Sequence, residues 1–211
     1  MGYFFLDIET YIDPEDELSG LNPYKSNSKV IAIAYNYYPD FILTENKIMP
    51  PTILKEWESD EKNILKEFYQ FLQKKVEEDE HIKLVGFNHI KFDIPYLSAR
   101  IDTHQIDGKQ NIHNTLYVKP HHIDLGQLAM TSSQRMKFKK EFYNVSIIEV
   151  CNFFGIPPKK ESAKKVSEYY QQAEYQKILD YIDSEFNFEK LYISLRRHFH
   201  SKRTMEKSND S

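Results

Sequence analysis

Short apolar runs separated by polar segments characterise the first 125 residues of the chain. Four of these runs predict strands, because each is brief, rich in β-branched or aromatic residues, and bounded by polar or turn-forming residues. They cover residues 3–8, 30–38, 82–87 and 122–125. A fifth run at 41–44 follows Pro39 and Asp40, and we expect it to pair with the run at 30–38 as a hairpin.

Apolar residues at helical spacing predict the remaining elements. The expected helices cover residues 59–79, a segment beginning at 94–97, 146–154, 162–171 and 174–198. Ser59 and Asp60 are both suitable N-caps for the first helix, and Pro95 is tolerated in the first turn of the second. Gly155 is a stop signal for the third. Loops are expected at 13–28, with a basic connector at 131–144.

The order of these elements predicts the fold class. Strands and helices alternate early, and helices fill the last third of the chain, which is typical of an α/β fold with a mixed β-sheet flanked by helices. We expect one domain over residues 1–200 and a polar, disordered tail over 201–211. The hydrophobic fraction of 40% is sufficient for an ordinary core.

Composition and charge exclude several classes of protein. One cysteine, Cys151, allows no internal disulfide, and neither a signal-peptide pattern nor an apolar run of about 18 residues is present. These features predict a cytoplasmic protein without membrane contacts. The net charge of −4 is unevenly divided: residues 1–100 hold 11 basic and 18 acidic residues, and residues 101–211 hold 17 and 14. Such a division suits acids that bind metal ions and bases that bind phosphates.

The most informative chemical feature is a set of carboxylates that follow two of the predicted strands. Asp7 and Glu9 are two residues apart, so a strand projects both to one face. Asp93 follows another apolar run and adds a third acid. Carboxylates on one face repel each other unless a cation lies between them, so the sequence predicts a divalent-metal site and a metal-dependent nuclease.

These motifs resemble the DEDD superfamily of 3'-5' exonucleases, and in particular the proofreading domains of family B DNA polymerases. Asp7 and Glu9 match the family's Asp-x-Glu motif, and Asn88 through Phe92 and Asp93 match its Asn-x-x-x-Phe/Tyr-Asp motif. The resemblance covers roughly residues 1–195 and implies an RNase H-like fold. No histidine lies between His122 and His198, which excludes the histidine form of the third motif and leaves the tyrosine subclass.

The third motif departs from the family pattern. Tyr181 and Glu185 are the best match to the family's Tyr-x-x-x-Asp, and their spacing of four places them on one helix face, with Asp183 pointing away. Glutamate replaces the family's aspartate, and its side chain is one methylene longer. Tyr170 and Glu174 form a poorer match in the preceding segment.

The resemblance implies two-metal hydrolysis of phosphodiester bonds from the 3' end of single-stranded DNA or RNA, with release of nucleoside 5'-monophosphates. Two Mg²⁺ or Mn²⁺ ions would be held by Asp7, Glu9, Asp93 and Glu185. Tyr181 would orient the attacking water, and Thr10, Asn88 and Phe92 would contact the substrate. Replication or repair proteins are possible partners, and the sequence gives no oligomeric state.

Other interpretations are open at this point. Asp7 and Glu9 could be ordinary strand-end acids, Asn88 and Asp93 a turn and a helix cap, and Phe92 a core residue. The residues assigned to structural or surface roles are Asp124 as a strand-end acceptor, Cys151 as core, and His121, His122, His198 and His200 as surface histidines. The rival functions are a non-catalytic nucleic-acid-binding module, which the glutamate at position 185 motivates, and a structure-specific endonuclease.

Overall fold

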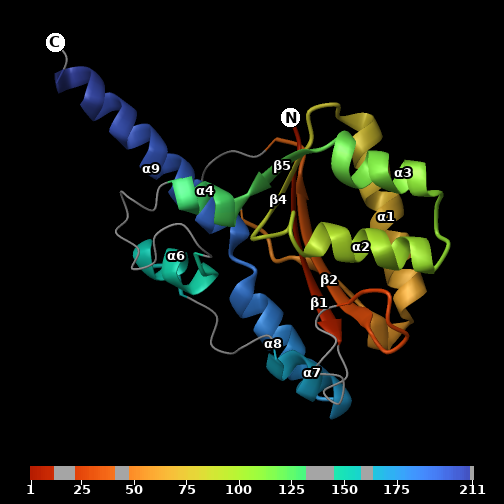
Figure 1. Ribbon diagram of the computed structural model, residues 1–211. Helices are drawn as coiled ribbons and strands as arrows, with labels where there is room; N and C mark the ends of the chain where they lie inside the picture. Colours follow the sequence, from red (N-terminus) through yellow and green to blue (C-terminus); the bar gives the residue numbers. More distant parts are fainter. Residues whose placement is uncertain (12–21, 41–47, 132–144, 158–163, 210–211) are drawn as a thin grey trace.

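A five-stranded mixed sheet forms the centre of the computed structural model, which describes residues 1–11, 22–40, 48–131, 145–157 and 164–209 (Figure 1). Its strands, in the spatial order β3-β2-β1-β4-β5, are β3 (Thr52–Lys55), β2 (Lys29–Tyr38), β1 (Tyr3–Tyr11), β4 (Lys83–Gly86) and β5 (His121–Asp124). β1 pairs antiparallel with β2 and parallel with β4, and β5 continues the parallel half. This arrangement confirms the predicted α/β fold with a mixed sheet.

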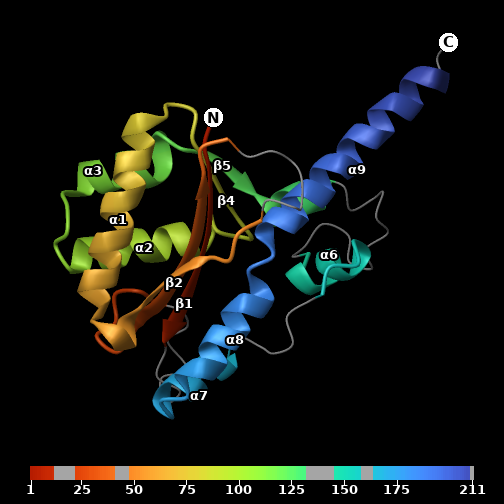
Figure 2. The same cartoon turned by 180° about the vertical axis from the view of Figure 1, so that it is seen from behind.

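Helices cover both faces of the sheet, as the two opposite views show (Figures 1 and 2). One face carries α1 (Glu61–Glu78), α2 (Asp93–Thr103), α3 (Lys109–His113) and the π-helical turn η4 (Asn114–Val118). The other carries α4 (Leu125–Thr131), α6 (Ile147–Phe153), α7 (Lys164–Gln171), α8 (Tyr175–Glu185) and α9 (Phe188–Asn209). A 3-10 turn, η3 (Glu56–Glu58), follows β3. Among the described residues no helix is both long and apolar enough to cross a bilayer.

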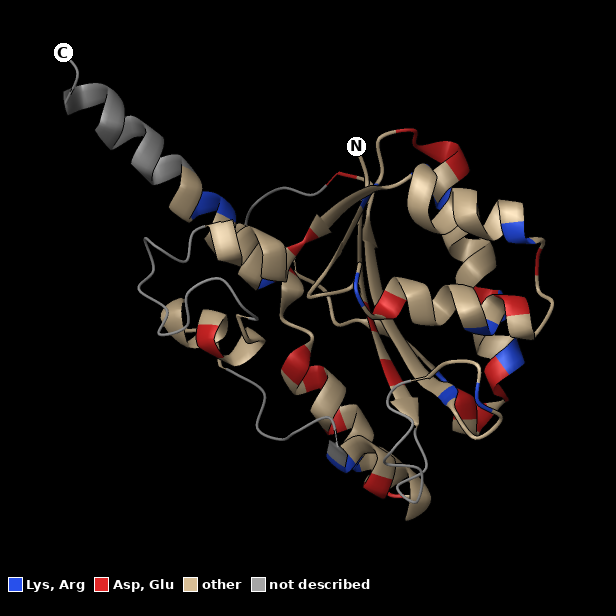
Figure 3. Ribbon diagram, in the orientation of Figure 1, with Lys and Arg blue, Asp and Glu red and all other residues tan. Residues whose placement is uncertain are grey.

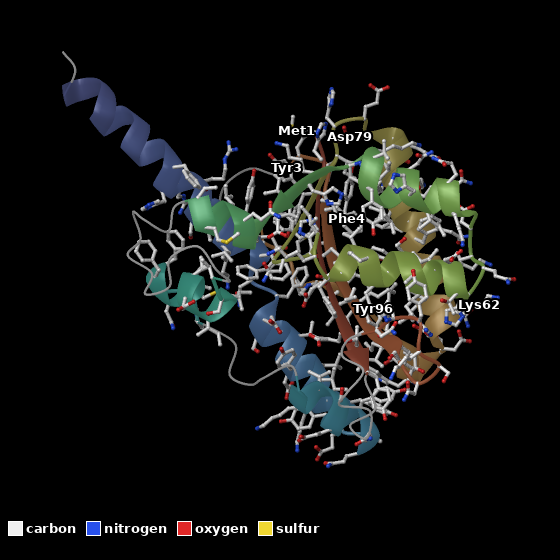
Figure 4. All side chains as sticks on the ribbon, viewed as in Figure 1. Met1, Tyr3, Phe4, Lys62, Asp79 and Tyr96 are labelled. Carbon is white, nitrogen blue, oxygen red and sulfur yellow. The ribbon has the colours of Figure 1, made fainter. Side chains whose placement is uncertain are left out.

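Alternation along β1 divides its side chains between two hydrophobic cores. Phe4, Leu6 and Ile8 are buried with α1 and α2 on one face, whereas Phe5 is buried with the C-terminal helices on the other. The period-2 pattern therefore points Asp7 and Glu9 toward α8. Figure 4 shows Phe4 and Tyr96 on the α2 side of the sheet.

The N-terminal end of β1 is fixed against the end of α1. The backbone N–H of Gly2 donates to the Asp79 carboxylate, and the Met1 ammonium lies 3.7 Å from the same oxygen (Figure 4). Lys83 N also donates to Gly2 O over 2.8 Å, which joins β4 to β1 at this end. β1 is longer than β4, so the C-terminal part of β1 extends beyond its pairing with β4.

Local sequence signals explain most helix ends. Asp60, rather than Ser59, caps α1 by accepting from Asn63 N over 2.8 Å. Ser146 forms a capping box with Glu149 at the start of α6, and Gly155 after it has φ +67°, a left-handed conformation that favours glycine.

Several elements differ from the sequence predictions. The single helix expected over 174–198 is interrupted, because the chain leaves helical geometry at Phe186 (ψ 67°), and Asn187 Nδ2 donates to Ser184 O. The interruption lets Phe186 and Phe188 both enter one core, with ring centroids 5.2 Å apart. Helix α9 extends to Asn209, and the polar, disordered tail expected over 201–211 stays a prediction.

The edge strand β3 and the turns at 109–118 were missed, because each is short and lacks a clear periodicity. The described partner of β2 on that side is β3. The expected hairpin strand at 41–44, the connector over 132–144 and the loop residues 13–21 lie outside the described residues.

Candidate active site

The C-terminal half of β1 supplies two acids. Glu9 is only 7% exposed and Asp7 is half-buried, so neither is a freely solvated strand-end acid. The pairing register shifts after Glu9: Glu9 faces Ala32, whereas Thr10 faces Val30, which leaves Ile31 as the extra residue of a bulge. Bulges change the direction in which strand side chains project, and they are common beside active sites.

Helix α8 supplies the opposing acid. Tyr181 is buried and Glu185 is half-buried, whereas Asp183 between them is exposed. Carboxylate oxygens of Asp7, Glu9 and Glu185 all lie within 4.8 Å of one another. Figure 3 shows acidic positions on both β1 and α8. The longer glutamate therefore reaches the acids of β1, and the geometry brings the predicted Tyr181–Glu185 pair to them.

Asp93 lies beside this cluster, at the first position of α2. β4 pairs only with residues 3–5 of β1, so the next part of β1 is open on that side. On this side of β1 the Ile8 N–H donates to Asp93 Oδ1 over 3.1 Å, in place of a bond to a neighbouring strand. Burial, reinforced by the charges of Glu185 and Asp124, raises the pKa of Asp93 to about 7 against the opposing effect of the N–H donors. Asp93 is therefore held at the site by the backbone of β1, next to the charge of Glu185.

Tyr181 is held in its protonated form. Burial, followed by the charges of Glu9 and Glu185, strongly raises the pKa of its phenol, and a hydrogen bond joins it to Glu185. A phenol in this environment donates a hydrogen bond and does not act as a base near neutral pH.

The position of Glu185 depends on the start of α9. Glu189, 1% exposed, accepts a 2.8 Å hydrogen bond from Asn36 Nδ2 on β2 and a 3.3 Å bond from the Tyr38 hydroxyl. These bonds connect the helical segment directly after the break to the sheet. Glu185 is the last residue of α8, so the break and this connection together set where its side chain lies.

The predicted substrate-contacting residues lie on β1 and on the segment between β4 and α2. Thr10 follows Glu9 on β1 and is half-buried. Asn88 has φ +56°, and its carbonyl accepts from Lys91 N and Phe92 N. Phe92 is half-buried and packs on Tyr96, with ring centroids 5.5 Å apart, against the core under α2. Its packing agrees with the interpretation of Phe92 as a core residue.

The poorer candidate pair lies elsewhere. The Tyr170 hydroxyl donates to the Glu56 carboxylate and accepts from Lys29 Nζ over 2.6 Å, while Glu174 pairs with Lys177. Cys151 is buried, as predicted, and burial raises the pKa of its thiol to about 11.

Two histidines differ from the prediction of surface positions. His122 is half-buried and bonded on both ring nitrogens, and the half-buried His198 packs on Phe153 and Phe154. His89, completely buried inside the second motif, was not identified as a contributor from the sequence. For His122, the sequence signal that could have predicted an inward position is strand alternation, because it turns one of the two neighbouring rings, His121 or His122, toward the interior.

The donor set is compatible with hard divalent cations. Three carboxylates that lie within 4.8 Å of one another repel strongly when all are ionised, and a cation between them removes this repulsion. Oxygen ligands of this type suit Mg²⁺ and Mn²⁺, and no described histidine or cysteine joins the cluster to make a zinc-type ligand set.

Comparison with known proteins shows a related fold. Among solved structures, the family B DNA polymerase from the hyperthermophilic archaeon Pyrobaculum calidifontis matches 90% of this chain with a TM-score of 0.56 and 17% identity. The match covers 24% of that polymerase, so it shows a common fold for about a quarter of the larger protein. A search of curated proteins finds no match.

A protein family described as "predicted 3'-5' exonuclease related to the exonuclease domain of PolB" matches residues 25–188. The matched range contains Asn88, Asp93, Tyr181 and Glu185, and it begins after Asp7 and Glu9. It covers more than half of the chain. The chain therefore belongs to the family of predicted 3'-5' exonucleases related to the exonuclease domain of PolB.

Proposed function

We propose that this protein is a metal-dependent 3'-5' exonuclease that removes nucleoside 5'-monophosphates from the 3' end of single-stranded DNA, with RNA as a possible second substrate. The observation that carries the proposal is the meeting of Asp7 and Glu9 from β1 with Glu185 from α8. The family to which the chain belongs supports the direction of cleavage.

Asp7, Glu9, Glu185 and Asp93 would hold two Mg²⁺ or Mn²⁺ ions. When bound, these ions supply Lewis-acid stabilisation of the attacking and leaving oxygens in an in-line displacement. In the overall reaction, a water oxygen bonds to the terminal phosphorus and the P–O3' bond breaks. The 3' oxygen of the shortened strand receives a proton.

The protein's own groups position the reactants. The raised pKa of Tyr181 keeps its hydroxyl protonated. Its one hydrogen bonds to Glu185 in the metal-free protein, and it would turn to the attacking water and orient it when Glu185 holds metal. Asp93 is fixed by Ile8 N before any substrate arrives. We assign Thr10 and Asn88 to contacts with the terminal nucleotide, and Phe92 to the packing that supports them.

The decisive assay uses single-stranded DNA and RNA oligonucleotides labelled at the 5' end, each with a free or a blocked 3' end, in Mg²⁺, Mn²⁺ or EDTA. We expect a ladder that shortens from the free 3' end, only with metal. Internal cuts on a blocked strand would show an endonuclease. Binding without cleavage under every metal condition would show the alternative, a non-catalytic nucleic-acid-binding module on the same fold.

Matched variants connect the activity to the site. Asp7→Ala must be inactive, whereas Asp183→Ala removes the same charge from the exposed face of α8 and should retain activity. Equal activity of the two variants would show that another nuclease in the preparation produces the ladder.

A further inference from the structure

A largely buried chain of polar side chains lies behind the β4–α2 loop (residues 87–92), which carries Asn88 and leads into Asp93. His122 Nε2 donates to Leu116 O over 2.9 Å, and His122 Nδ1 lies 3.1 Å from His89 Nε2. His89 Nδ1 then faces Asp124 Oδ2 at 3.8 Å. The side chains of His89 and Asp124 are 0% and 1% exposed. The imidazole rings stack with centroids 5.2 Å apart.

Asp124 connects this chain to the second motif. Its Oδ1 accepts from three backbone N–H groups: Asn88 over 3.1 Å, Gly126 over 2.9 Å and Gln127 over 3.2 Å. The last two bonds hold the start of α4, and the first holds the residue at which the β4–α2 loop turns with φ +56°. The same carboxylate therefore fixes two segments against each other.

Close packing leaves this loop little freedom to move. A Cβ atom on Gly126 would lie 2.5 Å from Asn88 Oδ1, and one on Gly86 would lie 2.9 Å from both His89 Cβ and Leu6 O. The loop continues through the 2.9 Å bond from Ile94 N to His89 O into α2, whose first residue is Asp93. Displacement of His89 or Asn88 would therefore move Asp93 away from Ile8.

The hydrogen bonds of the two imidazole rings also indicate that no proton lies between His89 Nδ1 and Asp124 Oδ2. Leu116 O can only accept, so His122 Nε2 carries a hydrogen and, in the neutral ring, Nδ1 accepts from His89 Nε2. Neutral His89 then presents a lone pair to Asp124 Oδ2. Burial lowers the pKa of His89 to about 4, although the charge of Asp124 opposes this shift. A backbone hydrogen bond also links His89 to Gly86; apart from it, neither facing atom has a hydrogen-bond partner among the described residues.

We propose that Asp124, His89 and His122 are positioning residues, which hold the β4–α2 loop so that Asp93 is presented to the metal site. The inference rests on the proposed function, because it gives Asp93 a metal-binding role. Groups that orient metal ligands typically contribute 10- to 100-fold to metal affinity or activity.

Mn²⁺ binding tests this proposal directly. The full chain is titrated with Mn²⁺, and free ion is followed by electron paramagnetic resonance for the wild type and for the variants His122→Ala, His121→Ala, Asp124→Ala and Asp124→Asn. His121 is the exposed neighbour of His122 on the same strand, and so provides the matched control. Urea unfolding establishes that each variant is folded under the conditions of the titration.

We expect half-saturation of the weaker-bound ion to need about 10- to 100-fold more Mn²⁺ in His122→Ala and Asp124→Ala. His121→Ala should remain within about threefold of the wild type, because it leaves the chain intact. Asp124→Asn should behave likewise, since its amide oxygen can still accept from Asn88 N and its NH₂ group can donate to His89 Nδ1. Nuclease activity should show the same shift in Mn²⁺ requirement, with kcat recovered at saturating Mn²⁺ and an unchanged KM for DNA.

Wild-type Mn²⁺ affinity in folded His122→Ala or Asp124→Ala would overturn the inference, as would equal impairment of Asp124→Asn and Asp124→Ala. If Asp124→Ala does not fold, His122→Ala and Asp124→Asn decide the question. A wild-type protein that binds Mn²⁺ without cleaving any substrate contradicts the proposed function, and the binding comparison still tests the positioning role. A wild-type protein that binds no Mn²⁺ overturns both.

Discussion

Neutralising one acid of the metal-free cluster should stabilise the folded protein. The perturbation is Asp7→Asn, which keeps the size of the side chain and removes one of three charges whose oxygens lie within 4.8 Å of one another. At that separation a pair of like charges repels by about 3.5 kcal/mol at an effective dielectric constant of 20, and by about 0.9 kcal/mol at 80. Asp7 takes part in two such pairs.

The half-exposed positions of Asp7 and Glu185 reduce the effect through solvent screening, so we expect the free energy of unfolding in EDTA to rise by about 1–3 kcal/mol. For a chain of this size that corresponds to an increase in Tm of about 2–12 °C. Asp183→Asn removes the same charge from an exposed position of α8, and should change stability by less than about 0.5 kcal/mol.

When metal is added, the wild type should become more stable than Asp7→Asn. A ligand present at 100 times its Kd stabilises the folded state by about 2.7 kcal/mol, and this gain requires the intact acid cluster. Urea unfolding and thermal melts with EDTA or Mn²⁺ measure both effects. The reasoning is refuted if Asp7→Asn is no more stable than Asp183→Asn in EDTA, or if Mn²⁺ stabilises Asp7→Asn as much as the wild type.

Three further predictions concern the site and its support. Glu185→Asp should retain or raise nuclease activity, whereas Glu185→Ala should lose at least about 100-fold in kcat, because Glu185 joins the carboxylate cluster. Single-turnover cleavage measures both variants, and an unaffected alanine variant rejects the assignment of Glu185 to the site. Gly86→Ala should lower the free energy of unfolding by about 1–3 kcal/mol because its Cβ meets Leu6 O, while Gly108→Ala, with nothing within 4 Å, is the control in the same urea titration. Although burial raises the pKa of Glu61, hydrogen bonds from Arg100 and His104 lower it overall, so its stabilising effect is present above the unfolded pKa of about 4.3 and is lost as the pH falls through the folded pKa. Glu61→Gln should therefore flatten the loss of stability below pH 5, and an unchanged acid limb in urea titrations would contradict this role.

Much of the fold follows from local patterns in the sequence. The runs of β1 and β2 are apolar and bounded by polar or turn-forming residues, and the caps at Asp60 and Ser146 use short-range hydrogen bonds, so their positions follow from nearby residues. The break at Phe186 could not be predicted in this way, because a continuous helix satisfies the same local pattern. Burial of Phe186 and Phe188 in one core, together with the bonds to Glu189, selects the interrupted form.

The sequence by itself identified the candidate acids: strand alternation places Asp7 and Glu9 on one face, and the resemblance to the DEDD exonucleases adds the second and third motifs. Only the tertiary structure decided that Glu185 reaches the acids of β1 and that Asp93 is bonded to Ile8. The physical reason is that these contacts join residues 85 or more positions apart, whose separation depends on how the strands and helices pack. The hydrogen-bonded side chains that connect Leu116 O to Asp124 likewise depend on the tertiary structure, since neither their burial nor their proton positions can be inferred from any one segment.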